Sequence, residues 1–529
     1  MGHTESMGTA MRYIDLFDRG AEFHPDRDVV RFQGRSWSFA QMQELTHRVA
    51  GGLVREGLQA AEAVAVLSPN HPYGVACQYG IVRAGLPYVP VNARNSRFDN
   101  AAVLEQLRVR FLFFHSSLAE HAEHLIATVP TLRGGVCLDA PAGERPGLDG
   151  WMPEAGSPDD SGYFPTGRDD VVALASTSGT SGRPKGVMLT NGNFECMAAS
   201  YQSLMHYDVP PVTVMAAPAT HAAGYMAGTL LPQGGTMVLL ETPDPVAIME
   251  AIQEHRATTI FMPPTLIYTL LAHPKVRDYD YSSLRYLIYG GAPIATAKLV
   301  EALDVFGPVL AHHYAQTEAA VVIAFMSPAE HVEARDDPRL TDRLRSSGRP
   351  GPFTRVAVMD DDGRLLGPGE SGEIVCRSSM VMKGYVDDPE ETARVGEFGW
   401  HHTGDIGVRD EHGYVHVVDR KKDMIISGGF NIYPAEVEQV VLQTATVQDC
   451  AVVGVPDDKW GEAVCAVLQL KPGMILDEPA ELRRWRELLG GVKCPKRIEI
   501  WPELPRNGAG KVLKRSIRDQ FWEGRARAI

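Results

Sequence analysis

The chain has 529 residues and a mass of 57.8 kDa, which is more than one hydrophobic core usually organises, so we expect two or more domains. Hydrophobic residues make up 44% and charged residues 22% of the sequence, which is typical of a globular protein and excludes a disordered or fibrous chain. The net charge of −15 disfavours nucleic acid as a partner, because the phosphate backbone attracts basic surfaces.

Neither a membrane span nor a secretion signal is predicted. No stretch approaches the ~18 consecutive apolar residues that a spanning helix needs, and residues 1–12 lack the charged start and apolar stretch of a signal peptide. The seven cysteines are scattered and form no C-x-x-C pair, which argues against a disulfide framework and against structural zinc. We therefore expect a cytoplasmic protein with no integral membrane association.

Short apolar runs alternate with helix-period segments through the first half of the chain. This alternation predicts an α/β fold with largely parallel sheets. The stretch 138–170 is rich in Pro, Gly, Ser and Asp, and it is predicted to be a long surface connection. The expected strands are 63–67, 88–91, 111–114, 237–240, 259–262 and 286–289, with a helix over 73–84.

The character of the sequence changes in the last third of the chain. A charge cluster at 420–423 follows the expected strands 356–359, 372–376 and 414–418, and we place the main domain boundary there. The boundary divides the chain into a large N-terminal domain, 1–420, and a small C-terminal α+β domain, 421–529, which is long enough to fold on its own. The expected C-terminal elements are strands 424–426, 451–455 and 463–469 and helices 434–444 and 478–489.

A loop of small and hydroxyl residues joins the apolar runs 171–175 and 187–189. Glycine and hydroxyl residues let N–H and O–H groups approach an anion closely, and a lysine adds positive charge. The loop does not match the Walker A spacing, because Arg183 and Pro184 separate its last glycine from the lysine. Composition alone also fits a flexible hairpin loop. Because the lysine is the first of the chain, we favour phosphate binding, with Thr177, Ser178, Gly179, Thr180, Ser181, Gly182 and Lys185 as the candidate contacts.

This loop resembles the signature of the adenylate-forming enzymes, which include acyl-CoA synthetases, peptide-synthetase adenylation domains and firefly luciferase. Further motifs of that family follow in order along nearly the whole chain, which makes the resemblance specific. It implies an N-terminal AMP-binding (adenylation) domain, a mobile C-terminal lid, and ATP, Mg²⁺ and coenzyme A as ligands. The additional motifs lie at 290–293, 314–318, 372–373, 383–385, 400–405, 419–438 and 504–511.

By this resemblance, Glu318 holds Mg²⁺, an ion that usually takes one or two carboxylates plus phosphate oxygens and water. From the residue alone, a surface acid or a helix N-cap fits equally well. Tyr314 offers an aromatic face for adenine, and Thr317 supplies a hydroxyl group. The family usually has Gly where this chain has Ala315, and the added methyl group would narrow the nucleotide site. The other implied nucleotide contacts are Gly291, Ala292, Pro293, His313 and Gln316.

The resemblance also assigns a ribose site and a hinge. Asp405, in a W-x-x-T-G-D motif, grips the ribose with the help of Arg420, although a lone Asp in a glycine turn is more often a turn former. Lys422, two residues further on, matches the family's hinge, where the backbone absorbs the change between domain orientations. A solvated linker charge is compatible with that role.

Two C-terminal positions are assigned to the chemistry in the same way. Gly428 and Gly429 match the acyl-CoA synthetase version of the motif and imply a passage for the pantetheine arm of CoA, in a turn that also starts a helix at Pro434. Lys511 matches the adenylating lysine. A positioned ammonium group that neutralises developing charge is typically worth ~10²–10³ in rate.

The motif at 218–225 borders the acyl site of the family. Amino-acid-activating relatives carry an aspartate nearby, and none lies between Ala216 and Gly228, so an uncharged acyl or aryl tail is favoured. His221 either gates that site or contacts the carboxylate, and an ordinary loop histidine is nearly as good an explanation. The implied catalytic residues are Thr180, Lys185, His221, Glu318 and Lys511.

The sequence therefore predicts an acyl-CoA synthetase that forms an acyl-adenylate from ATP and then transfers the acyl group to CoA. Three alternatives remain open: loading of a carrier-protein thiol, catalysis of only one half-reaction, and a nucleotide-binding regulator without catalysis. Whether the chain forms a homodimer is also left open.

Overall fold

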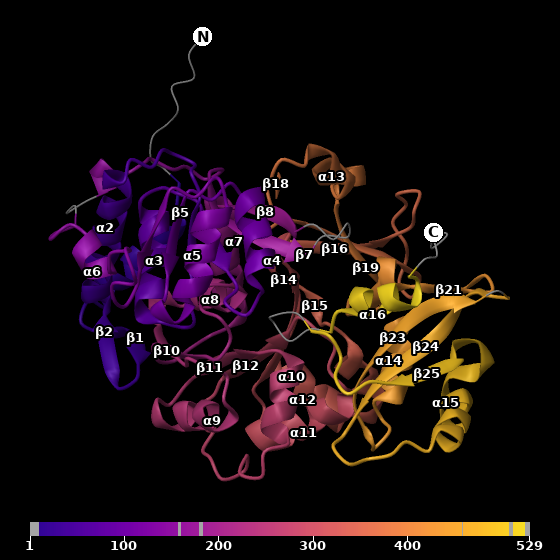
Figure 1. Cartoon of the computed structure of the whole chain (residues 1–529). Coiled ribbons are helices and arrows are strands. Elements are labelled where there is room, and N and C mark those ends of the chain that lie inside the picture. Colours follow the sequence, from indigo (N-terminus) through magenta and orange to yellow (C-terminus); the bar gives the residue numbers. More distant parts are fainter. Residues whose placement is uncertain (1–9, 157–159, 179–183, 458, 507–511, 524–529) are drawn as a thin grey trace.

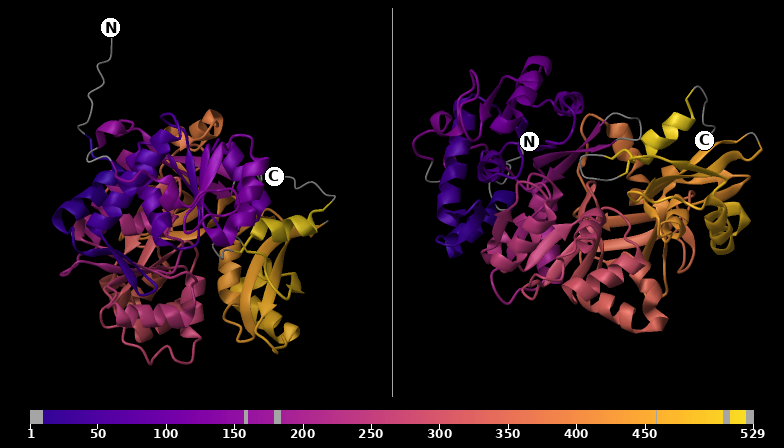
Figure 2. Two further views of the ribbon diagram at one scale, coloured as in Figure 1. Left: turned by 60° about the vertical axis from the view of Figure 1, so that its left-hand side comes forward. Right: turned by 60° about the horizontal axis from the view of Figure 1, so that its bottom comes forward.

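The computed structural model describes residues 10–156, 160–178, 184–457, 459–506 and 512–523. Figure 1 traces the chain from its indigo N-terminal region to its orange and yellow C-terminal region, which lies to one side of the rest. Both views of Figure 2 keep that separation. Among the described residues, no helix is long and apolar enough to cross a membrane.

The first sheet has the order β18-β8-β7-β4-β3-β5-β6, and β4, β3, β5 and β6 pair in parallel. Its central strands are apolar on both sides, because Phe111 and Phe113 join one core cluster while Leu112 and Phe114 join another. A parallel sheet with both faces buried is the expected result of such runs. The strands are β3 (Val64–Leu67), β4 (Tyr88–Val91), β5 (Phe111–Phe114), β6 (Gly134–Cys137), β7 (Val171–Ser178), β8 (Pro184–Thr190) and β18 (Gly384–Tyr385).

The second sheet has the order β15-β14-β13-β12-β11-β9-β10-β1-β2. It is parallel from β1 through β13, while β2, β14 and β15 pair in antiparallel fashion. The carboxyl ends of β12 and β13 therefore lie at one edge, which is where ligands bind in open α/β sheets. The strands are β1 (Asp28–Phe32), β2 (Arg35–Ser38), β9 (Val212–Met215), β10 (Thr236–Leu239), β11 (Thr259–Met262), β12 (Tyr286–Gly290), β13 (Leu310–Gln316), β14 (Ala319–Met326) and β15 (Arg349–Pro350).

Helices cover these sheets. Helix α7 begins directly after β8, where Thr190 accepts a hydrogen bond from Asn193 N and forms a capping box. The N-terminal helices are α1 (Tyr13–Phe23), α2 (Phe39–Arg55), α3 (Pro72–Arg83), α4 (Arg97–Gln106), α5 (Ala119–Thr128), α6 (Leu148–Trp151), α7 (Asn191–Leu204), α8 (Ala222–Gly228), α9 (Pro245–Glu254), α10 (Pro264–Leu271), α11 (Thr296–Phe306), α12 (Pro328–Asp336) and α13 (Pro389–Arg394).

The third and fourth sheets follow in the chain. The third is antiparallel, in the order β16-β17-β19-β20, and comprises β16 (Thr354–Met359), β17 (Ser371–Ser378), β19 (His401–Arg409) and β20 (Val415–Arg420). The fourth has the order β22-β21-β24-β23 with β25 beside β24, and helices α14, α15 and α16 follow in the same region. Its elements are β21 (Ile425–Ser427), β22 (Phe430–Ile432), α14 (Pro434–Val441), β23 (Val447–Asp457), β24 (Gly461–Leu470), α15 (Glu478–Lys493), β25 (Arg497–Ile500) and α16 (Lys514–Phe521).

The α/β class with mostly parallel N-terminal sheets and a smaller C-terminal domain is confirmed. The prediction that 138–170 is entirely a surface connection is wrong in one part. Helix α6 lies inside it, and Trp151 is buried between Phe111 and Phe113, with ring centroids 5.7 and 5.3 Å away. Leu148 and Met152 are buried in the same core cluster, so this part of the segment packs into the core.

Candidate active site

Asp405 is the centre of a buried polar cluster on the third sheet. It lies on β19 directly opposite Arg420 on β20, and its Oδ1 is 2.6 Å from Arg420 Nε. Its Oδ2 accepts hydrogen bonds from the Tyr314 hydroxyl at 2.5 Å and from Gln316 Nε2 at 2.8 Å. Burial, and then the Asp405 charge, raise the pKa of Tyr314 well above its ordinary value, so this hydroxyl group stays a donor.

Tyr314 therefore contacts the Asp405 cluster through its hydroxyl group. Its ring packs in a small core cluster with Ala324 and Ile374. Ala315 and Gln316 follow it at the end of β13, and Thr317 and Glu318 form the turn into β14. The expected aromatic face for adenine is thus largely buried, because Tyr314 is only 9% exposed.

Tyr385 joins Lys185 to Glu318. Its hydroxyl group donates to Glu318 Oε1 at 3.0 Å, and its ring centroid lies 5.0 Å from Lys185 Nζ. Lys185 lies opposite Thr177 in the β7–β8 pair, and its ammonium group is paired with Glu391 of α13. The hydrogen bonds from Arg394, opposed by burial and helped by Lys185, lower the pKa of Glu391 to about 2.

The donor set around Glu318 suits Mg²⁺. Within the described residues, no group of three or more His, Cys, Asp or Glu side chains comes together to hold a metal. A lone carboxylate matches the needs of this ion, since Mg²⁺ keeps several waters and takes phosphate oxygens as ligands.

The two clusters form one site, because Gln316 and Glu318 belong to the same hairpin. Gly291, Ala292 and Pro293 follow β12 at the same edge of the second sheet, next to β13. His313 is buried on β13, where burial lowers its pKa to about 3, and its Nδ1 lies 2.9 Å from the Tyr201 hydroxyl. His313 therefore faces Tyr201 of α7.

The linker between the two domains is held from both sides. Lys421 Nζ pairs with Asp361 at 2.7 Å and Glu373 at 3.2 Å in the N-terminal region, whereas Asp423 pairs with Arg518 of α16 at 3.6 Å. Lys422 lies between them, and its carbonyl oxygen accepts a hydrogen bond from Arg518 at 3.3 Å.

Gly428 and Gly429 form the turn between β21 and β22, with φ of +57° and +83°. The Gly428 N–H donates to the Trp460 carbonyl oxygen, and a Cβ at Gly428 would lie 2.5 Å from Trp460 Cε3. Glycine is therefore required at Gly428 both by the backbone and by the indole ring. The expected site residues that lie outside the described residues are Gly179, Thr180, Ser181, Gly182 and Lys511, and the side chain of Ser178 lies outside them as well.

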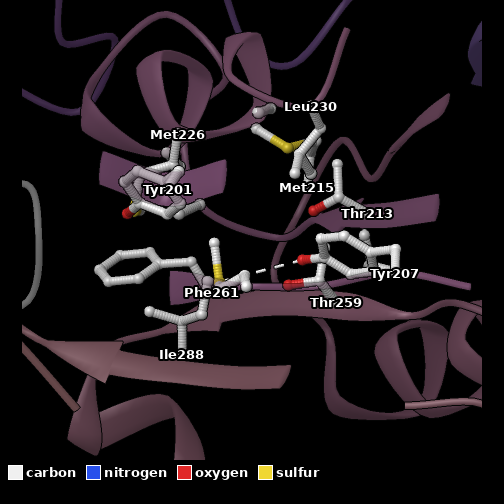
Figure 3. A pocket seen from close by; sticks show the side chains of 14 residues that line it. Tyr201, Tyr207, Thr213, Met215, Met226, Leu230, Thr259, Phe261 and Ile288 are labelled. Atoms are coloured by element: carbon white, nitrogen blue, oxygen red, sulfur yellow. Dashed lines mark hydrogen bonds between the residues drawn. The ribbon is translucent and has the colours of Figure 1, made fainter. Parts of the chain in front are cut away.

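An apolar pocket lies between the second sheet and helices α7 and α8 (Figure 3). None of the described residues that line it is charged. Its walls include Tyr201, Met215, Met226, Leu230, Phe261 and Ile288. His221 directly precedes α8; burial lowers its pKa to about 4, and its Nδ1 lies 2.9 Å from the Thr220 hydroxyl. His221 is thus neutral at pH 7.

The sequence profile of AMP-binding enzymes matches residues 17–386, and that of the AMP-binding enzyme C-terminal domain matches residues 436–511. The chain belongs to the AMP-binding enzyme family. Feruloyl-CoA synthase of an Amycolatopsis species is 38% identical to this AMP-binding enzyme over 95% of the chain and 98% of that protein. A medium/long-chain-fatty-acid–CoA ligase of Mycobacterium tuberculosis is 39% identical over 68% of the chain and 63% of that protein.

Solved structures show the same fold. The amide bond synthetase McbA of Marinactinospora thermotolerans is 30% identical and superimposes with a TM-score of 0.87, covering 96% of this chain and 100% of that one. This structural similarity extends through both domains.

Sequence reasoning missed Glu391 and gave Tyr385 no role of its own. Glu391 lies in an acidic stretch at the start of α13, which is typical of an exposed helix N-terminus. The pairing of β18 with β8 brings this region to Lys185. That pairing was not predicted from the sequence.

Proposed function

We propose that this AMP-binding enzyme converts a carboxylic acid with an apolar, ring-bearing acyl group into its CoA thioester. The protein is an AMP-forming acid–thiol ligase that uses ATP, Mg²⁺ and CoA. The observation that carries the proposal is that one hairpin, β13–β14, joins two sets of contacts, Lys185–Tyr385–Glu318 and Gln316–Asp405, in a chain that also has an uncharged pocket.

In the first half-reaction, the chain's own residues place the carboxylate against the α-phosphate of ATP. Lys185 neutralises phosphate charge, and the hydroxyl loop, including Thr177, donates hydrogen bonds to the phosphate oxygens. Asp405 with Arg420 holds the ribose hydroxyl groups. Glu318 would hold Mg²⁺, which would neutralise part of the negative charge on the phosphates. We assign to Lys511 the stabilisation of the negative charge that develops as the carboxylate attacks the α-phosphate.

In the second half-reaction, the C-terminal domain turns about Lys422 and presents the turn at Gly428 and Gly429 to the thiol. The linker contacts support this division at 420/421, because Lys421 binds the N-terminal region and Asp423 binds α16. Rotation about a short linker that is anchored at both ends is a hinge motion. His221, the N-cap of helix α8, whose residue Ala223 lines the pocket, is assigned to contact with the substrate as a neutral group.

The acid is proposed to be aromatic or otherwise ring-bearing. The pocket offers aromatic and Met side chains and no charge, which suits an apolar ring and excludes an amino-acid ammonium group. The name of the feruloyl-CoA synthase relative agrees with such a substrate. We further propose a cytoplasmic location, where ATP and CoA are supplied, and leave a homodimer to be tested by sedimentation.

Glu391→Gln is expected to lower the KM for ATP by roughly 3–10-fold. The substitution removes a carboxylate that competes with the phosphates for Lys185, and it removes one negative charge from their surroundings. Initial-rate kinetics with varied ATP check this result. Glu390→Gln, which removes the same charge from the exposed neighbour on α13, is the control and should leave the KM unchanged. An increased KM in Glu391→Gln would show that the carboxylate instead holds Lys185 in its working position.

Gly428→Ala is expected to slow thioester formation at least ~10-fold and to leave adenylate formation within about twofold of wild type. The added methyl group collides with Trp460 at a positive φ, so the turn must change shape. Pyrophosphate release measures the first step, and transfer from supplied acyl-adenylate to CoA measures the second. Gly473→Ala, at a positive φ in a turn with open space around it, is the matched control. Equal losses in both steps would contradict the assignment of this turn to the thiol.

The decisive experiment is a panel of carboxylic acids scored by pyrophosphate release, with and without CoA. We expect acid-dependent pyrophosphate release with aryl acids and a thioester product when CoA is added. An acyl product found only on a carrier protein would support loading of a carrier-protein thiol in place of CoA. Pyrophosphate release without any thioester would support an enzyme that catalyses only the first half-reaction. No acid-dependent release at all would overturn the proposed function in favour of a nucleotide-binding regulator.

A further inference from the structure

The pocket has a defined direction relative to the carboxyl ends of β12 and β13, where the nucleotide is proposed to bind; we call this the nucleotide edge. Strand β12 reaches that edge at Gly290, and its residue Ile288 pairs with Phe261 of β11 in the pocket wall. Thr259 pairs with Tyr286, four residues before Gly290, which at about 3.3 Å per residue is roughly 13 Å from the edge. An acid with its carboxylate at the nucleotide therefore directs its far end toward Thr259.

This far end of the pocket is polar, in contrast to its walls. Thr213 of β9 and Thr259 of β11 are register partners in neighbouring parallel strands, and both line the pocket. Tyr207 adds a phenolic hydroxyl group, and Figure 3 shows the three hydroxyl groups on the same side of the pocket. One level nearer the nucleotide edge, the same strands present Met215 and Phe261.

The Thr259 hydroxyl group is buried and unsatisfied within the described residues. Thr259 is 2% exposed, and its Oγ1 has no hydrogen-bond partner, although the Tyr207 hydroxyl group lies beside it. Tyr207 donates to the sulfur of Met205 at 3.9 Å, and the nearby Thr259 hydroxyl group partly offsets the rise in the pKa of Tyr207 that burial causes. Since buried hydroxyl groups are nearly always paired, an unpaired one that lines a ligand pocket indicates a partner supplied by the ligand.

We propose that Thr259, together with Thr213 and Tyr207, binds a hydroxyl group at the far end of the acyl substrate. This inference rests on the proposed function and narrows its substrate class to carboxylic acids whose apolar ring carries a distal hydroxyl group. Thr259 accepts the substrate O–H, and Tyr207 is placed to donate to the same oxygen. An alkyl chain in this position leaves the Thr259 oxygen buried without a partner.

A site that pairs with a substrate hydroxyl group discriminates strongly against the analogue that lacks it, because the protein's polar groups then stay unpaired. The test uses 3-(4-hydroxyphenyl)propenoic acid and 3-(4-methylphenyl)propenoic acid, which differ by a hydroxyl and a methyl group of similar size. The wild-type kcat/KM for pyrophosphate release is expected to be roughly 10–100-fold higher for the hydroxy acid.

Thr259→Val keeps the β-branched shape that strand β11 requires and removes the hydroxyl group. We expect it to reduce the preference for the hydroxy acid at least ~5-fold, mainly by raising kcat/KM for the methyl acid. Thr269→Val, the same exchange on the exposed side of α10, is the control and should keep the wild-type preference.

Equal kcat/KM values for the two acids in the wild type, or an unchanged preference in Thr259→Val, would overturn the inference while leaving acyl-CoA synthesis intact. Absence of pyrophosphate release with every acid of the wider panel would instead overturn the proposed function. Because the methyl acid reports on Thr259→Val directly, sustained turnover of that acid shows that the variant is folded.

Discussion

Asp405→Asn is expected to lower kcat/KM for ATP by about 10²–10³-fold. The carboxylate accepts from Tyr314 and Gln316 and pairs with Arg420, and each of these three partners is a donor. An amide keeps one acceptor oxygen and turns an NH₂ group toward one of those donors. Loss of charge-assisted hydrogen bonds in a buried cluster costs about 3–4 kcal/mol, which corresponds to this range of rates.

Acid-dependent ATP–pyrophosphate exchange measures this effect, with circular dichroism to confirm the fold. Tyr314→Phe removes a single donor from the same carboxylate and leaves its charge, and it is expected to cost no more than ~10-fold. Exchange in Asp405→Asn within threefold of wild type would mean that this cluster supports the sheet and does not bind the nucleotide.

The strands of the sheets could be predicted from the sequence because burial on both faces produces continuous apolar runs. The runs at 111–114 and 259–262 match β5 and β11 to the residue. Trp151 escaped prediction, since turn-forming residues surround it and its contacts with Phe111 and Phe113 are tertiary.

The candidate site was predictable only as separate motifs. Lys185 was predicted from the composition of its loop and Glu318 from the family resemblance, but Glu391, which pairs with Lys185, lies 206 residues further along the chain. The Tyr385–Glu318 hydrogen bond spans 67 residues and the Tyr314–Asp405 bond spans 91. Tyr314 illustrates this limit of sequence analysis. Its residue type predicted an aromatic face for adenine, but the hydrogen bond from its hydroxyl group to Asp405 depends on how β13 and β19 are placed in the fold.

A second buried charge cluster, to which no role was assigned from the sequence, joins the C-terminal elements to the N-terminal domain. Lys514, the first residue of α16, places its Nζ 2.8 Å from Glu438 of α14, and Glu438 also accepts from Val452 N at 2.7 Å. Asp419 of β20 accepts from Ala435 N at the start of α14, at 2.6 Å. Because Lys514 lies three residues after Lys511, this cluster fixes the helix that follows the proposed adenylating lysine.

Burial raises the pKa of Glu438, and Lys514 opposes that rise. Burial alone would lower the pKa of Lys514, but Glu438 and Asp419 outweigh it and hold that pKa above its ordinary value. Each member of the pair therefore depends on the other to compensate its charge.

Lys514→Met is expected to destabilise the C-terminal domain by about 3–5 kcal/mol at pH 8, because it leaves the Glu438 carboxylate buried without its counter-ion. Without Lys514, the folded-state pKa of Glu438 rises further above its unfolded value, so the folded chain takes up a proton as the pH falls. The destabilisation therefore has its full size at pH values above the folded-state pKa of Glu438. It decreases as the pH falls toward the unfolded-state pKa of about 4.5. Thermal unfolding at pH 8 and pH 5 checks this sign, and we expect a smaller deficit in Tm at pH 5.

The double variant Lys514→Met/Glu438→Gln separates loss of charge balance from loss of packing. The amide can still accept from Val452 N, and its burial carries no charge, so the double variant should recover at least half of the lost stability. A Tm deficit that is the same at both pH values, or a double variant no more stable than Lys514→Met, would show that the aliphatic stem of Lys514 matters more than its charge.

A pH-dependent deficit with recovery in the double variant would instead link the stability of α16 to the protonation of one buried carboxylate. In that case, adenylate formation in Lys514→Met should fall as the pH rises from 5 to 8 relative to wild type, since α16 follows directly on the loop that carries Lys511.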